Sequence, residues 1–254
     1  MLSPSLLLHC LCILIATTLF KSTPTIAVEA NSYLRDDPRL PSQGTKNWDF
    51  LQSSTSKFTP RHSHATCIFK CPDNSGDSCI WLVGGYSEEH RTYNGEMENA
   101  NSDVWFSKDG ANWHQVTALH GDFLQGVGNG DAKYGGYVAP FYSRYAHILE
   151  ALDYDGDGIA DIMILAGGFN PTPSNDVWLT TDGVTWYFDG YAPWPKRAYH
   201  GSTVFQNKLM ILGGTPLSND VWAGALVKDT SRRAGYKLEW QQMLAPNEAP
   251  WMPR

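Results

Sequence analysis

Residues 197–222 read RAYHGSTVFQNKLMILGGTPLSNDVW, and the motifs in this stretch occur three times along the chain in the same order. Each copy has Arg-x-x-His, an apolar run ending in Gly-Gly, the tripeptide Asp-Val-Trp, and a closing tryptophan. The copies begin at Arg61, Arg144 and Arg197; their apolar runs are IWLVGG (80–85), IMILAGG (162–168) and LMILGG (209–214); they close at Trp113, Trp186 and Trp240. Such internal repetition predicts several copies of one structural unit.

Each copy predicts four antiparallel strands. The first follows Arg-x-x-His, the second is the apolar run, the third contains Asp-Val-Trp, and the fourth starts at the closing tryptophan. Asp-Gly lies between the third and fourth strands in SKDGAN (107–112) and TTDGVT (180–185), and this dipeptide is typical of tight hairpins. One such unit cannot bury both its faces, so copies that pack face to face predict an all-β propeller.

The order of the glycine pair, Asp-Val-Trp and the closing tryptophan resembles the kelch repeat family. The resemblance covers residues 47–254 and implies a kelch-type β-propeller of four-stranded antiparallel blades. It implies a lone strand at 47–60, blades at about 61–117, 144–188 and 197–243, and an insertion at 118–143. These are fewer blades than close a kelch propeller, so we expect an incomplete propeller, with assembly from several chains as the alternative. Two apolar blade faces would then be uncovered.

The N-terminal region differs from the repeats in character. Leu6–Phe20 is an apolar run of 15 residues, which suits the core of a signal peptide better than a membrane span. Small residues follow, so we predict a signal peptide over 1–30, cut after Ala27 or Ala30, and a linker over 31–46. A signal anchor is the alternative. The prediction is a secreted or luminal protein without a membrane span after signal removal.

Cysteine use agrees with an extracellular setting, and the net charge bears on the class of partner. Cys71 and Cys79 flank the turn-rich segment PDNSGDS, which predicts a disulfide across the base of a hairpin and leaves Cys67 as a buried free thiol. The three thiols match no common zinc spacing. A net charge of −7 without clustered Lys and Arg argues against nucleic acid as a partner.

The stretch DYDGDGIAD (153–161) packs four aspartates into nine residues between the first two strands of the second copy. An EF-hand loop begins similarly, but its twelfth position needs Glu and here is Ile164. The stretch resembles the calcium hairpin of integrin-type propellers. That resemblance implies a structural calcium ion, with an unbound acidic turn as the alternative. Its ligands would be the side chains of Asp153, Asp155, Asp157 and Asp161 and the carbonyl of Ile159.

The Arg-x-x-His motifs open the first strands, which line the central channel of a propeller. Their histidines are His64, His147 and His200. Three histidines could bind a metal and three arginines could hold a carboxylate. Residues that recur once per repeat are more often architectural, so we predict no catalytic residue among them.

Two insertions, residues 86–102 and 118–143, fall between strands at the same end of the predicted propeller. Long loops on a rigid scaffold commonly carry binding sites. Aromatic and imidazole side chains there could contact a sugar or a peptide, although unselected insertions are an equal alternative. The candidates are Tyr86, His90, Tyr93, Tyr134 and Tyr137.

The function predicted from these features is a secreted binding or scaffold module for an extracellular protein or glycan. The alternative is a carbohydrate-active or galactose-oxidase-like enzyme whose remaining blades are missing from this chain. The copper ligands of galactose oxidase, which shares the kelch-type propeller, cannot be mapped onto this sequence. The sequence contains no Gly-x-Ser-x-Gly elbow, phosphate-binding loop or zinc-binding helix motif.

Overall fold

The computed structural model describes residues 58–93, 96–116, 140–169 and 171–254. The chain divides into two units, Met1–Phe50 and Leu51–Arg254, and every described residue lies in the second unit. The predicted signal peptide, the linker, most of the lone strand 47–60 and all but the last four residues of the insertion 118–143 lie outside the described residues.

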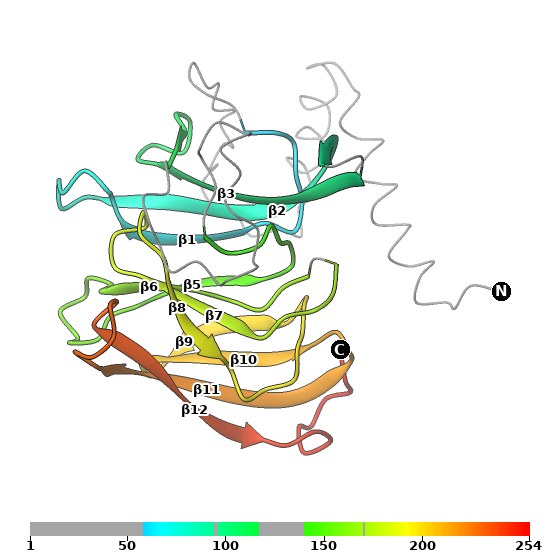
Figure 1. Ribbon diagram of the computed structural model, residues 1–254. Coiled ribbons are helices and arrows are strands. Elements are labelled where there is room, and N and C mark those ends of the chain that lie inside the picture. The colour runs from blue at the N-terminus through cyan, green and yellow to red at the C-terminus, as the bar shows by residue number, and fades with distance from the viewer. Residues whose placement is uncertain (1–57, 94–95, 117–139, 170) are drawn as a thin grey trace, which may run out of the picture. The chain divides into compact units, whose positions relative to one another are not determined.

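Three four-stranded antiparallel sheets make up the described structure, one for each copy of the repeat, and Figure 1 shows them one beneath another. Within each sheet, strands that follow one another in the chain are neighbours. The first sheet contains β1 (Ala65–Lys70), β2 (Ser78–Tyr93), β3 (Glu96–Ser107) and β4 (His114–Gln115). The second contains β5 (Ile148–Leu152), β6 (Ile162–Ala166), β7 (Asp176–Thr180) and β8 (Tyr187–Tyr191). The third contains β9 (Gly201–Phe205), β10 (Lys208–Gly214), β11 (Ser218–Lys228) and β12 (Tyr236–Leu244).

These sheets confirm the predicted all-β fold, and no helix occurs in the described ranges. The fold is β-propeller-like, with blade-like units that do not close into a ring within this part of the chain. The sequence explains the strands well, because each apolar run leads to a glycine pair with positive φ, where the strand ends or its register shifts.

The middle sheet is buried on both of its faces. All five residues of β6 are buried, and they alternate between two hydrophobic clusters. Met163 and Leu165 pack with the first sheet, whereas Ile162 and Ile164 pack with the third. Side chains alternate between the faces of a strand, so a continuous apolar run is what a strand between two sheets requires.

The outer sheets leave part of their outward faces exposed. In β10, Leu209 and Ile211 are buried while the intervening Met210 is only half-buried. On the outward faces, Phe205 of β9 and Ile68 of β1 are each 59% exposed. Some apolar side chains are therefore exposed on the outward face of each outer sheet, whereas others there are buried.

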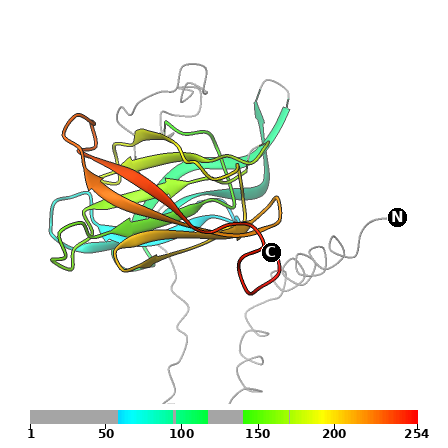
Figure 2. The same ribbon diagram turned by 90° about the horizontal axis from the view of Figure 1, so that it is seen from below.

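The insertion at 86–102 differs from the predicted loop. Strands β2 and β3 continue through it as a ribbon, whose pairs include Thr92 with Met97 and Tyr93 with Glu96. In Figure 2 the ribbon projects past the other strands. The two residues between the strands are Asn-Gly, the dipeptide most typical of two-residue hairpin connections, and this signal predicts the ribbon.

Candidate functional site

The arginine of each Arg-x-x-His motif binds the aspartate of Asp-Val-Trp in the same repeat. In the second sheet, Arg144 Nη1 donates to Asp176 Oδ1 at 2.8 Å and Nη2 donates to Oδ2 at 2.6 Å. Nη1 also donates to the carbonyl of Gly167 at 2.8 Å, and Trp178 Nε1 donates to Asp176 Oδ2. The equivalent pairs are Arg61 with Asp103 and Arg197 with Asp220. In each repeat one hydrogen-bonded network thus joins the arginine, the first glycine of the pair and Asp-Val-Trp.

These ion pairs are internal to the fold. The side chains of Arg144 and Asp176 are 4% and 5% exposed. Burial raises the pKa of Asp176, but Arg144 and the other donors around the carboxylate lower it more, so the pKa lies below its ordinary value. A bidentate pair of this kind holds the two charges in one geometry and loses much stability if one partner is removed. The arginines are therefore not placed as a clamp for a ligand carboxylate.

The histidines of the second and third repeats pack between neighbouring sheets. A Cβ atom on Gly84 would lie 2.9 Å from His147 Cε1, and one on Gly167 would lie 2.7 Å from His200 Cε1. Each imidazole thus fills the space beside the first glycine of the preceding repeat. Burial lowers the pKa of both His147 and His200 to about 3. His64, in the first repeat, is exposed.

The acidic stretch 153–161 forms the turn between β5 and β6. Asp153, Asp155 and Asp161 each bring one carboxylate oxygen to within 4.8 Å of the others, and this is the only group of potential metal ligands of that size within the described ranges. Asp157 lies outside the group, and its Oδ1 accepts the N–H of Ile159 at 2.7 Å. Three of the four predicted carboxylate ligands are thus brought together.

Backbone donors hold this acidic turn in shape. The carboxylate of Asp153 accepts the N–H groups of Gly158 and Gly156, each at 2.7 Å, and these bonds lower its pKa. Asp161 Oδ2 accepts the N–H of Tyr154 at 2.7 Å. Gly156 and Gly158 have positive φ, 79° and 89° respectively, which favours residues without Cβ. A cluster that offers only oxygen atoms suits a hard cation such as calcium.

An aromatic cluster lies where the Arg-x-x-His motifs meet β2. Ring centroids are 5.2 Å apart between Tyr86 and Tyr145 and 6.2 Å apart between Tyr145 and Tyr199. His62 stacks near Tyr86 at 5.1 Å, and Phe169 lies 5.5 Å from Tyr145. We call these five residues the aromatic cluster; its Tyr199 side chain is 54% exposed.

Only part of the predicted ligand surface can be placed. Tyr86 is in the aromatic cluster, where its hydroxyl accepts a hydrogen bond from Asn99 Nδ2 at 2.7 Å. His90 and Tyr93 belong to β2, but the structure does not describe their side chains. Tyr134 and Tyr137 lie outside the described residues. Tyr145 and Tyr199 were not among the predicted residues. Their signal is the variable middle of Arg-x-x-His, which is aromatic in both copies.

The predicted disulfide is confirmed. Cys71 and Cys79 are joined, with their Cα atoms 5.1 Å apart, at the base of the β1–β2 hairpin. Cys67 is free, as predicted, but half-buried, with its Sγ 3.2 Å from Met163 Sδ. Burial raises the pKa of this thiol, so it is protonated at neutral pH.

Comparison with known proteins adds a likeness in structure alone. No family model matches the sequence, and no curated protein matches it. The solved structure of YjhT aligns with a TM-score of 0.44 and 18% identity over 73% of this chain and 47% of that one. This chain thus spans about half the length of YjhT. Among the described residues, no helix is long and apolar enough to cross a membrane.

Proposed function

We propose that this protein is a secreted binding or scaffold module that takes an extracellular protein or glycan at the aromatic cluster. The observation that carries the proposal is the contrast between two sets of residues at the same motifs. The arginines are held in buried ion pairs, and the buried histidines pack against glycines of the preceding repeat. Tyr199 and its neighbours, by contrast, present aromatic surface. Tyrosines supply large contact area together with a hydroxyl, which suits recognition of mixed polar and apolar ligands.

The backbone beneath the cluster supports a preorganised surface. Ala146 N–H donates to the Ser63 carbonyl at 2.8 Å, and Tyr199 N–H donates to the Ala146 carbonyl at 2.9 Å. These bonds join the same motif position in successive repeats. Side chains that stand on such a linked backbone lose little freedom when a ligand binds.

Two further features support the extracellular and calcium parts of the proposal. The Cys71–Cys79 disulfide is of the kind that persists in oxidising compartments. The oxygen cluster of Asp153, Asp155 and Asp161 could hold calcium as a structural ion, with Asp157 and the carbonyl of Ile159 as the other proposed ligands. Such an ion would neutralise the like charges and brace the β5–β6 turn.

A binding screen with one matched pair of variants tests the function. The secreted protein is applied to a glycan array and to immobilised extracellular proteins, alongside Tyr199→Ala and Tyr191→Ala. Alanine is compatible with position 199, because Ala146 has the same φ of 55° at the same motif position. Tyr191 is more exposed than Tyr199 but lies outside the aromatic cluster.

We expect a ligand that the wild type and Tyr191→Ala retain and that Tyr199→Ala binds at least tenfold more weakly. Equal retention by both variants, or no ligand at all, would count against this function.

A further inference from the structure

We propose that the outward face of the third sheet docks the first sheet of a second copy of this chain, and that two copies thereby close one ring. Successive sheets within the chain are joined by a contact between the first glycine of one pair and the histidine of the next Arg-x-x-His motif. The third sheet carries the glycine of such a contact, and the first sheet carries the histidine. This self-association goes beyond ligand binding at the aromatic cluster and does not depend on it.

Gly213 is the glycine that the third sheet offers. Its φ of +60° matches the +58° of Gly84 and the +64° of Gly167. A Cβ atom on either of those two glycines would meet the imidazole of the next repeat. By contrast, the described atoms nearest to a Cβ atom on Gly213 belong to the backbone of Arg254 and Ser218. Among the described residues, no imidazole therefore packs as closely against Gly213 as against the other two glycines.

His64 is the matching histidine of the first sheet. It is exposed, whereas His147 and His200 are buried against the glycine of the preceding repeat. Beside Gly213 of another copy, His64 would make the contact that His200 makes with Gly167. Each outer sheet thus carries one half of the internal contact, and the two halves fit each other because they belong to the same repeated unit.

Apolar side chains on the third sheet agree with a further sheet packed against it. The residue five positions after each histidine is Phe69, Leu152 and Phe205 in turn; the first two are 1% and 0% exposed, whereas Phe205 is 59% exposed. The residue three positions after the closing tryptophan shows the same change, from 6% for Val116 to 47% for Met243. Phe69 and Val116 belong to the cluster shared with the following sheet. Docking of another sheet would therefore remove apolar surface from water at both positions.

The first sheet offers a side chain that faces Phe205 in this arrangement. Ala151 of the second sheet packs against the hydrophobic cluster that contains Phe69 of the first. Ile68 holds the position of Ala151 in the first sheet and is 59% exposed. In the docked pair, Ile68 of one copy and Phe205 of the other would meet as Ala151 and Phe69 do within the chain.

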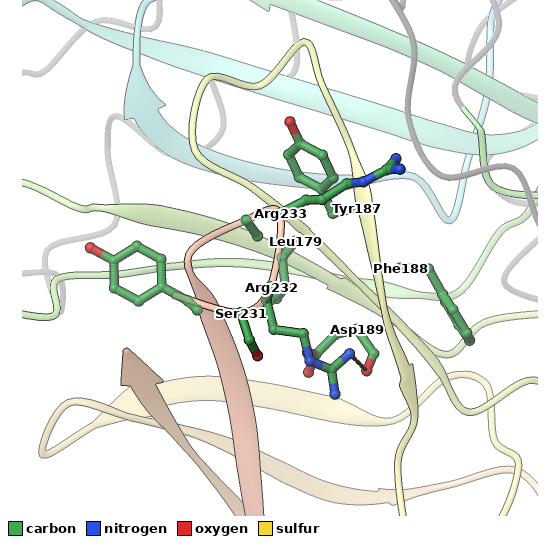
Figure 3. Close-up of a pocket in the computed structure, with 9 residues that line it drawn as sticks. Leu179, Tyr187, Phe188, Asp189, Ser231, Arg232 and Arg233 are labelled. Atoms are coloured by element: carbon green, nitrogen blue, oxygen red, sulfur yellow. Dashed lines mark hydrogen bonds between the residues drawn. The ribbon is translucent and has the colours of Figure 1, made fainter. Parts of the chain in front are cut away.

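The turns between third and fourth strands show which internal contact is the closer model for docking. Figure 3 shows Arg232, from the β11–β12 turn, reaching across to Asp189 on β8, where its Nη1 donates to the Asp189 carbonyl at 3.3 Å. The β3–β4 turn, SKDGAN, instead has the length of TTDGVT in the second sheet, whose Gly183 lies against Trp81 of the first. Met243 takes the place of Asp189 on the third sheet. The first sheet of a second copy would therefore pack there as the second sheet packs on the first.

Residues 251–254 occupy the entry to such a further sheet. Gly214 N–H donates to the Arg254 carbonyl at 2.7 Å, the same bond that Gly85 makes with the arginine of the second repeat at 2.9 Å. The third sheet is thus able to bind the arginine that opens a further repeat. Residues 251–254 read WMPR and residues 58–61 read FTPR, so both are an aromatic residue, a variable residue, proline and arginine. A second copy can therefore place FTPR on the same backbone donors in exchange for WMPR.

The number of copies follows from the number of sheets. A contact between two different faces closes into a ring or extends as a filament. Two copies bring six sheets, because each contributes three. Propellers typically close with about 4–8 blades, so six sheets fall inside that range and the nine sheets of three copies fall outside it. The expected assembly is therefore a dimer with two equivalent interfaces.

Sedimentation velocity and light scattering of the secreted protein over a range of concentrations test the interface. Ile68→Lys places a charge on the docking face of the first sheet, and Phe205→Lys places one on that of the third. Both side chains are largely exposed, so the monomer is expected to fold with either lysine. Tyr191→Lys, at an exposed position of the second sheet, is the matched control. If thermal unfolding shows that a lysine variant is not folded, serine replaces lysine at that position.

We expect the wild type and Tyr191→Lys to form a dimer, and Ile68→Lys and Phe205→Lys each to weaken it at least tenfold. An equimolar mixture of these two variants should form dimers again, because one of the two interfaces in the mixed pair then has both faces unaltered. A monomeric wild type, an open-ended assembly, or a mixture that stays monomeric would overturn the proposal. Loss of the dimer in only one of the two variants would indicate pairing of like faces and would also overturn it.

Discussion

Gly167 shows at single-residue scale why the glycine pair recurs. Its φ is +64°, and a Cβ atom would lie 2.7 Å from His200 Cε1 and 3.0 Å from the Arg197 carbonyl oxygen. The position therefore excludes side chains for two separate reasons, backbone conformation and contact with the next repeat. Gly76 has a similar φ of +80° but open space around the missing Cβ. The two glycines separate the two reasons.

Gly167→Ala is therefore expected to lower the free energy of unfolding by on the order of 3 kcal/mol, from left-handed strain together with overpacking. Gly76→Ala should cost only about 1 kcal/mol, because strain alone operates there. Urea unfolding followed by tryptophan fluorescence measures both values. Equal losses would show that the imidazole of His200 moves aside to accommodate the added methyl group.

The β5–β6 turn, at the scale of one element, concentrates negative charge without a positive side chain in its sequence. Its carboxylates are held by backbone N–H groups, so the turn can form before a cation arrives. Binding to the folded state alone raises stability with ligand concentration, by about 2.7 kcal/mol at one hundred times the dissociation constant.

Calcium is accordingly expected to raise the unfolding temperature of the wild type in chelator-treated buffer, because only the folded turn assembles the oxygen cluster. Asp155→Asn, which removes one charge from the cluster, should abolish most of the rise. Asp109→Asn, in the β3–β4 turn, is the control and should keep it. Scanning fluorimetry with calcium and with magnesium makes the measurement. An unchanged midpoint in the wild type, or the same rise in Asp155→Asn, would contradict the calcium site.

Two imidazoles buried between sheets make the stability of the whole molecule sensitive to acid. His147 and His200 have pKa values of about 3 when folded, against about 6.5 when unfolded. Below pH 6.5 the unfolded chain binds more protons than the folded one, so acid favours unfolding. The stabilisation from neutral imidazole is complete above pH 6.5 and is lost as the pH falls toward 3.

Urea unfolding at pH 7, 6, 5 and 4 should therefore show stability falling by about 1.4 kcal/mol per pH unit for each buried histidine once the pH is well below 6.5. His200→Gln should reduce this slope by about 1.4 kcal/mol per pH unit, because one of the two buried imidazoles is then absent. A flat profile between pH 6 and 4 would mean that the imidazoles become solvated in the folded state.

Much of the fold could be predicted because its signals are local. Strand spans follow from apolar runs, glycine pairs and turn dipeptides, and the disulfide follows from two cysteines at the base of one hairpin. The Asn-Gly dipeptide at 94–95 likewise predicts a hairpin between β2 and β3, although the length of the insertion 86–102 favoured a loop. The clustering of carboxylates in the β5–β6 turn could also be predicted from the sequence, because the four aspartates lie within nine residues.

The sequence by itself determined the repeat, the four strands of each copy and the acidic turn, because hydrogen bonding and side-chain alternation act between residues close along the chain. Only the tertiary structure decided which arginine pairs with which aspartate and that His147 and His200 pack between sheets. It also decided that Tyr86, Tyr145 and Tyr199 share one cluster. It also brought Asp189 to Arg232 across two sheets. These contacts join residues far apart in the chain, and the packing of sheet against sheet fixes them.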